Sequence, residues 1–228
     1  MNTSWPFPLW IAHRGAGKLA PENTLAAFRV GASHGYRAFE CDVKLSADGV
    51  PFLLHDPTLQ RTTDGHGAAG EPIARFDAVA RYCLRNGFAL NIEIKPSPGT
   101  EDETGRAVAR EVERLWAGVT ALPLLSSFQP AAIAAAKAAA PQLPRALLFE
   151  GLRDGWLDEA RALDCVAVVA DYPSLDAALI ARVHAAGMRA LTYTVNDPAL
   201  AHALLAAGID GIVTDAVDRF SPGTTVQD

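Results

Sequence analysis

The chain has 228 residues, half of them hydrophobic, which is enough to bury one sizeable core. Its net charge of −6 and the lack of any run of Lys and Arg argue against a nucleic-acid partner, which would require a basic patch. No stretch reaches the ~18 uninterrupted apolar residues of a membrane span, and the first eight residues lack the features of a signal peptide. The three cysteines are far apart and without metal-ligand spacing, so we expect reduced thiols and a cytoplasmic location.

Short apolar runs typical of strands alternate with helix-like stretches along the whole chain. Strands are predicted at Leu9–Ala12, Ala38–Asp42, Ala89–Ile94, Ala121–Ser126, Arg145–Leu148, Val166–Ala170, Arg189–Thr194 and Gly211–Thr214. Helices are predicted at Thr24–His34, Asp77–Asn86, Glu101–Trp116, Pro130–Ala139, Asp158–Leu163, Leu175–Ala186 and Pro198–Ala207. Strands joined by crossover helices pair in parallel. The pattern therefore predicts a (β/α)8 TIM barrel, with an open doubly wound sheet as the alternative.

One segment, between the second strand and the next helix, breaks this alternation. Asp48–Gly49, flanked by alternating residues, is a hairpin signal, and a loop rich in Thr, Gly and Asp follows it. We expect one domain, residues 1–228, with a small insertion at about 44–76. In a barrel the insertion would lie at the catalytic end and could wall the site, with His66 as a candidate for the rim.

Three carboxylates stand at the ends of otherwise apolar strands. Glu40 and Asp42 are two residues apart and share one strand face, and Glu93 ends the next strand. Carboxylates that meet at one barrel mouth repel each other unless a cation lies between them, and oxygen ligands select Mg²⁺ or Ca²⁺. The structural alternative is that Lys95 pairs with Glu93 while Glu40 is exposed and pairs with Arg37.

Two histidines follow apolar runs and precede charged residues. His13 comes before Arg14, and His55 comes before Asp56. Two imidazoles at one mouth suit general acid–base catalysis, because their unperturbed pKa lies near neutrality. A lone histidine of this kind is more often structural, but the nearby carboxylates favour function here. Three further histidines, His34, His184 and His202, lie in predicted helices and are interpreted as surface residues.

Positive charge and neutral polar groups complete the candidate site. Arg14 offers a planar fork for phosphate oxygens and Lys95 a point charge. Together with a divalent ion inside an acidic protein, they indicate a small anionic substrate. Gln129 and Tyr193, in later strand-end segments, are candidates for substrate contact. Helix capping and core packing explain these two residues equally well.

Several motifs in order along the chain resemble the glycerophosphodiester phosphodiesterase family. They are His13–Gly15, Pro21–Thr24, Glu40–Val43, Asp48–Pro51, His55–Asp56, Glu93–Lys95, Ser127–Phe128, Thr194–Asn196 and Gly208–Asp215. The resemblance implies a (β/α)8 barrel, a divalent metal, and hydrolysis of glycerophosphodiesters to sn-glycerol 3-phosphate and an alcohol. Carried over residue by residue, it makes His13 and His55 the acid–base pair. Glu40, Asp42 and Glu93 become the metal ligands, and Arg14 and Lys95 hold the phosphoryl oxygens.

The chain departs from the family pattern in two places, of which the second, a smaller cap, should leave the alcohol side of the substrate more open. Tyr193 stands where many relatives have tryptophan, and the lobe that follows residues 65–70 is trimmed. Two other readings stay open. One is a phospholipase D-like or phosphoinositide phospholipase C-like enzyme on lipids, which would need an apolar rim, for which only Trp5 and Phe7 are available. The other is a non-catalytic phosphodiester-binding module.

Overall fold

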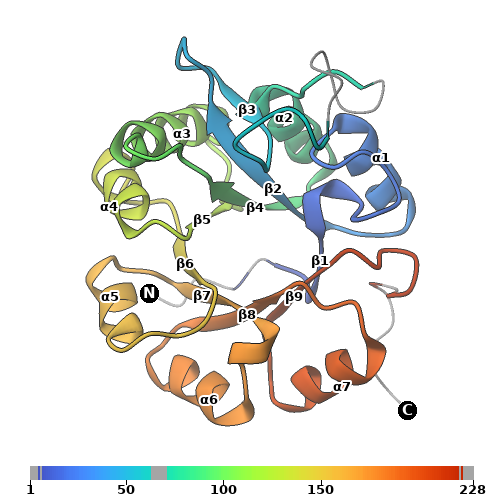
Figure 1. Cartoon of the computed structure of the whole chain (residues 1–228), viewed down its shortest axis with the longest axis vertical. Helices are drawn as coiled ribbons and strands as arrows, with labels where there is room; N and C mark the ends of the chain where they lie inside the picture. Colours follow the sequence, from blue (N-terminus) through green and yellow to red (C-terminus); the bar gives the residue numbers. More distant parts are fainter. Residues whose placement is uncertain (1–4, 6, 63–70, 221, 223–228) are drawn as a thin grey trace.

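Eight parallel strands form a closed ring in the computed structural model, which describes residues 5, 7–62, 71–220 and 222 (Figure 1). His66, the predicted rim residue, lies outside the described residues. The strands are β1 (Trp10–Ala12), β2 (Ala38–Leu45), β4 (Ala89–Ile94), β5 (Leu124–Ser127), β6 (Arg145–Phe149), β7 (Ala167–Asp171), β8 (Arg189–Tyr193) and β9 (Gly211–Thr214). The ring closes because β1 pairs in parallel with both β9 and β2. The predicted (β/α)8 barrel is confirmed and the open sheet is wrong.

Helices surround this ring and connect its strands (Figure 1). They are α1 (Leu25–Ser33), α2 (Phe76–Asn86), α3 (Glu101–Leu115), α4 (Pro130–Ala139), α5 (Trp156–Ala162), α6 (Ala177–Ala185) and α7 (Pro198–Ala206). The side chains of Thr24, Asp176 and Asp197 accept hydrogen bonds from the first turns of α1, α6 and α7, which fixes where these helices begin. Among the described residues, no helix combines the length and the apolarity needed to cross a bilayer.

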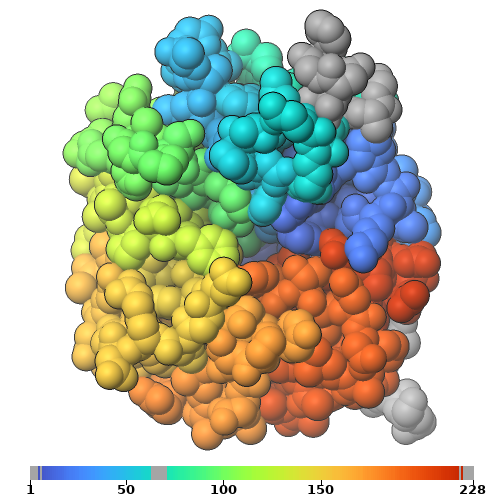
Figure 2. All heavy atoms as spheres, in the orientation of Figure 1, coloured from blue at the N-terminus to red at the C-terminus, as the bar shows by residue number. Residues whose placement is uncertain are grey.

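The predicted hairpin follows the second barrel strand. β3 (Pro51–Leu53) pairs antiparallel with the end of β2, and Gly49 in the turn has a φ of 77°. β2 therefore extends three residues beyond the predicted end at Asp42, because its last residues gain a partner in β3. Figure 2 shows the segment after β3, in cyan, over the front of the barrel beside the blue segment that follows β1.

Alternation along the strands separates two apolar cores. In β2, Phe39 and Cys41 pack toward the helices, whereas Ala38 belongs to a smaller cluster of inward-facing residues. Phe7 is buried in the inner cluster and Trp5 packs against it, with ring centroids 5.0 Å apart. These two aromatic residues are thus part of the barrel packing and do not form the apolar rim that a lipid-directed enzyme would need.

The cysteines are buried in the fold. Cys41, Cys83 and Cys165 are all free, as predicted. Burial raises the pKa of each thiol, to about 12 for Cys83 and Cys165, so these groups stay neutral and unreactive at physiological pH.

Candidate active site

Three buried carboxylates meet inside the mouth of the barrel. Because side chains alternate along β2, Glu40 and Asp42 both face inward, above Ala38. The parallel register of β2 and β4 sets Asp42 directly beside Glu93. One carboxylate oxygen from each of the three residues lies within 4.8 Å of the others. The structure thus brings together all three predicted metal ligands.

This acidic cluster has the properties of a cation site. Burial, followed by repulsion from neighbouring carboxylates, raises the pKa of Glu93 to about 7 and that of Glu40 well above its usual value. Oε1 of Glu40 is buried and has no hydrogen-bond partner among the described residues. An unpartnered buried oxygen is costly unless something binds it. The cluster can therefore hold a metal ion, and its oxygen ligands suit a hard divalent cation.

Two cations border the carboxylates. Nζ of Lys95 donates to Glu93 at 2.9 Å and to Asp42 at 3.2 Å, and Nε of Arg14 lies 3.3 Å from Asp42. Burial alone would raise the pKa of Asp42, but the charges of Lys95 and Arg14 outweigh it and hold that pKa below its ordinary value. Lys95 does pair with Glu93, as the structural alternative proposed. Glu40, however, is buried, and the guanidinium of Arg37 bonds a backbone oxygen instead.

The loop between β1 and α1 gives the site its amide and guanidinium groups. Arg14 and Asn23 both have positive φ, 49° and 60°, which is uncommon for residues other than glycine. The backbone N–H of Arg14 donates to Glu40 at 3.0 Å, and the Asn23 amide donates to Asp42 at 2.7 Å. Strained backbone of this kind recurs at functional sites, where the surrounding contacts maintain it.

His13 is held by a carboxylate from the other end of the chain. Its Nδ1 lies 2.6 Å from Oδ1 of Asp215, just after β9, and its Nε2 lies 3.8 Å from Glu40. Asn196 accepts the backbone N–H of Asp215 at 2.8 Å and so orients it. Burial would raise the pKa of Asp215, but its bond to His13 outweighs this and lowers it.

A glycine makes this contact between the chain ends possible. A Cβ at Gly17, whose φ is +56°, would lie 2.1 Å from the backbone oxygen of Asp215. The loop after β1 can therefore lie directly on the segment after β9. Sequence reasoning placed Asp215 and Asn196 in the family motifs, and offered the Asn196 amide as a possible substrate contact, but connected neither to His13, because nothing local links them to it.

His55 makes the second histidine–carboxylate pair. It follows β3, and its Nδ1 lies 2.6 Å from the adjacent Asp56. Burial is the main cause of the lowered pKa of His55, so the neutral ring predominates at neutral pH. If Nδ1 donates its proton to Asp56, Nε2 is left as a proton acceptor.

Replacing Asp215 with asparagine is expected to lower kcat by roughly 10²-fold, the lower end of the range for impaired acid–base catalysis. An asparagine cannot fix the His13 tautomer or stabilise its cation as a carboxylate does. The matched control is Asp210→Asn, because Asp210 also pairs with a histidine, His184, at 2.7 Å, but lies before β9 at the opposite end of the barrel. Steady-state kinetics of both variants should separate them, and equal losses would contradict the role of Asp215.

Tyr193 and Gln129, the two remaining residues predicted to contact substrate, have different surroundings. The Tyr193 ring packs edge-on against Phe128, with centroids 5.8 Å apart, and its hydroxyl donates to the backbone oxygen of Phe149. Gln129 is exposed at the start of α4, where its backbone N–H donates to Ser127. Within the described residues, the Gln129 side chain forms no hydrogen bond with the groups above, and its role stays a prediction. The helical histidines His34, His184 and His202 are exposed, as predicted.

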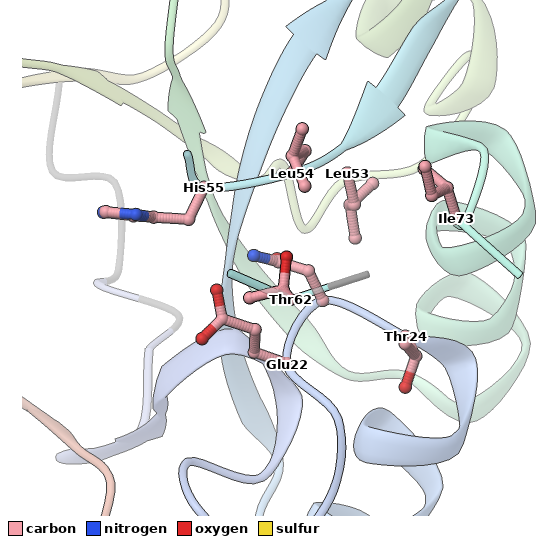
Figure 3. A pocket seen from close by; sticks show the side chains of 8 residues that line it. Glu22, Thr24, Leu53, Leu54, His55, Thr62 and Ile73 are labelled. Carbon is pink, nitrogen blue, oxygen red and sulfur yellow. The ribbon is translucent and has the colours of Figure 1, made fainter. Parts of the chain in front are cut away.

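A small pocket lies between the loop after β1 and the segment after β3 (Figure 3). It is lined by Glu22, Asn23, Thr24, Leu53, Leu54, His55, Thr62 and Ile73. Figure 3 shows Glu22 and His55 at one end of the pocket, and Thr24 and Ile73 at the other. The two segments therefore approach each other beside His55.

A parallel barrel with two histidine–carboxylate pairs and two cations around a buried acidic cluster at its mouth is the architecture of a barrel phosphodiesterase. Comparison with known proteins specifies the family. The profile of the Glycerophosphoryl diester phosphodiesterase family matches residues 13–76 and 67–219. The chain therefore belongs to the glycerophosphoryl diester phosphodiesterase family.

Individual relatives agree with this assignment along most of the chain. A glycerophosphodiester phosphodiesterase of Caldanaerobacter subterraneus subsp. tengcongensis is 30% identical over 236 residues, covering 91% of this chain and 93% of its own. An Oleispira antarctica phosphodiesterase, solved in complex with the product sn-glycerol-3-phosphate, superposes with a TM-score of 0.87 at 31% identity. That match covers 93% of this chain and 95% of the other. Human glycerophosphodiester phosphodiesterase 1 is 46% identical over 82 residues, which is 34% of this chain and 25% of the human protein.

Proposed function

We propose that the protein hydrolyses glycerophosphodiesters to sn-glycerol 3-phosphate and an alcohol, with Mg²⁺ or Ca²⁺ held by Glu40, Asp42 and Glu93. The observation that carries the proposal is that Oε1 of Glu40, in a buried acidic cluster, has no hydrogen-bond partner in the described part of the chain and lies next to a histidine held by Asp215. A binding module has no need of a histidine whose tautomer is fixed toward such a cluster. The family and the Oleispira antarctica relative with its bound product support the substrate class.

The two histidines divide the proton transfers. Neutral His55 accepts a proton at its ring Nε2. The proton comes from the attacking oxygen as that oxygen bonds to phosphorus. The bond from phosphorus to the leaving alcohol breaks, and protonated His13 gives its proton to the departing alkoxide. Asp215 stabilises the His13 cation before this transfer, and Asp56 keeps His55 in the accepting tautomer.

Positive charge supports the same step. Arg14 and Lys95 stabilise the charge that develops on the phosphoryl oxygens. A divalent ion bound to the carboxylates supplies Lewis-acid polarisation of the phosphodiester. We further propose that residues 1–228 form one domain acting on a small-molecule diester in the cytoplasm, which the free buried cysteines support.

The decisive experiment is a coupled assay for sn-glycerol 3-phosphate released from glycerophosphocholine. Release by the wild-type protein and its loss in His55→Ala would support the proposal. No release from any glycerophosphodiester, with the protein folded, would contradict it. Sedimentation with anionic and neutral liposomes separates the lipid-directed alternative, which requires vesicle binding.

Chelation with EDTA should abolish activity, and Mg²⁺ or Ca²⁺ should restore it while added NaCl does not. The physical reason is that Lys95 and Arg14 balance only part of the charge of the three carboxylates, and a divalent ion held by their oxygens would polarise the phosphodiester. The same ions should raise the melting temperature of the EDTA-treated protein, because they bind only the folded state. Full activity after exhaustive chelation would contradict the assignment of the cluster.

Metal affinity should rise as the pH rises through about 7. Protons compete with the metal because the pKa of Glu93 is raised to about 7 by burial, and that of Glu40 is also raised. At low pH the cluster holds protons that the metal must displace; at high pH it does not. Calorimetric titration with Mg²⁺ at several pH values checks this, and a pH-independent affinity would contradict it.

A further inference from the structure

Arg61 lies in the segment after β3 and bonds two carboxylates from different parts of the chain. Its Nη1 and Nη2 donate to Glu22, in the loop after β1, at 3.1 and 2.7 Å. Its Nη2 also donates to Asp56 at 3.0 Å, and its Nε donates to the second oxygen of Asp56. Arg61 thus holds each of the two carboxylates by two hydrogen bonds. The planar guanidinium allows this geometry, whereas a lysine does not.

Both partners of Arg61 continue into the candidate active site. Asp56 bonds Nδ1 of His55 at 2.6 Å, and Glu22 accepts from Nη1 of Arg14 at 3.0 Å. The result is a chain of alternating charges, formed by Arg14, Glu22, Arg61 and Asp56, that ends at the ring of His55. Hydrogen bonds from Arg61 lower the pKa of both carboxyl groups and, for Glu22, outweigh the effect of burial, so both groups stay charged well below neutral pH.

The contacts of Arg61 bear on the orientation of the His55 ring. Asp56 follows His55 directly in a loop, so without a second contact its carboxylate can turn toward solvent. Arg61 anchors it to Glu22 and thereby to the loop that carries His13 and Arg14. We propose that Arg61 is a positioning residue that fixes the orientation and tautomer of His55 through Asp56, with Glu22 as its anchor. This inference rests on the proposed hydrolase function.

Exposure distinguishes this role from a general effect on stability. The Arg61 side chain is 51% exposed, and ion pairs of exposed side chains contribute little to the free energy of unfolding. Its loss should therefore leave the fold intact. A displacement of about 1 Å in a reacting group can nevertheless cost up to ~10²-fold in rate.

The test compares Arg61→Gln with Arg61→Lys and with a matched control. Arg75 follows in the same insertion, is 66% exposed and, among the described residues, forms its side-chain ion pair with the nearby Asp77, so Arg75→Gln should match wild type. We expect Arg61→Gln to lower kcat about 10–100-fold with KM within about threefold, because orientation is lost while substrate contacts remain. Arg61→Lys should recover part of the loss, since the charge is kept without the fork.

A double-mutant cycle and a spectroscopic readout test the route through Asp56. If Arg61 acts through Asp56, Arg61→Gln should change kcat little in an Asp56→Asn background. In NMR spectra, the Nδ1 proton of His55 should be protected from exchange in wild type and in Arg75→Gln, and lost in Arg61→Gln. Unchanged kcat, additive losses in the cycle, or a retained Nδ1 resonance would each overturn the proposal. Failure of the wild-type protein to release sn-glycerol 3-phosphate would instead overturn the proposed function.

Discussion

Replacing His13 with alanine is expected to lower kcat by at least ~10²–10⁴-fold, the contribution of one positioned acid or base. The His13 ring bridges the acidic cluster and Asp215, with Nε2 3.8 Å from Glu40 and Nδ1 2.6 Å from Asp215. Its loss would remove the proposed proton donor for the leaving alcohol. Single-turnover measurements of sn-glycerol 3-phosphate release report this chemical step directly.

The matched control removes a histidine from a similar pair elsewhere. His184 is 2.7 Å from Asp210, and its side chain is 38% exposed, so His184→Ala should retain wild-type turnover. Circular dichroism should show that both variants are folded. Turnover like that of wild type in folded His13→Ala would rule out His13 as a catalytic residue.

The second large effect is expected for Glu40→Gln, with opposite signs for activity and stability. Removal of one of three carboxylates should weaken Mg²⁺ binding by more than the ~10–100-fold that follows loss of an outer-shell partner, and activity should fall with it. The metal-free protein, however, should become more stable. A glutamine can still accept the Arg14 N–H, and its amide can donate to the neighbouring carboxylates.

The direction of this stability change follows from the raised pKa of Glu40. An acid whose folded-state pKa lies above its unfolded value destabilises the fold increasingly as the pH rises above the unfolded value. At pH 8 in EDTA, Glu40→Gln should therefore melt higher than wild type, by about 2–4 °C for each kcal/mol regained. With Mg²⁺ present the order should reverse, since only wild type binds the ion tightly.

Differential scanning calorimetry with and without Mg²⁺ checks both halves of this prediction. Glu103→Gln, on the exposed face of α3, provides a control with no change in either condition. A Glu40→Gln protein that melts lower than wild type in EDTA would show that Glu40 stabilises the fold and is not held there for a cation.

Local sequence predicts most of the barrel because strand and helix periods are short-range properties. Each predicted helix begins and ends within two residues of the observed one. The largest difference at a strand start is in β5, which begins at Leu124 and not at Ala121. Pro123 precedes it and has no N–H for the sheet.

Much of the candidate site is also predictable from the sequence. Alternation along β2 determines that Glu40 and Asp42 share a face, and crossover connections determine that Glu93 follows at the same end. Charged residues that end buried strands are a signal that the sequence shows directly. Their metal-binding role stays a proposal, although their proximity is established.

What the sequence determined by itself is thus the set of strands, the end of the barrel that carries charge, and the principal acidic and imidazole groups. Only the tertiary structure decided which carboxylate holds each histidine and which cation joins the loops. Asp215 reaches His13 because β9 pairs with β1 when the ring closes, across a separation of 202 residues. Arg61 reaches Glu22 because the insertion lies on the loop after β1. Such contacts depend on ring closure and loop packing, which no local pattern of residues encodes.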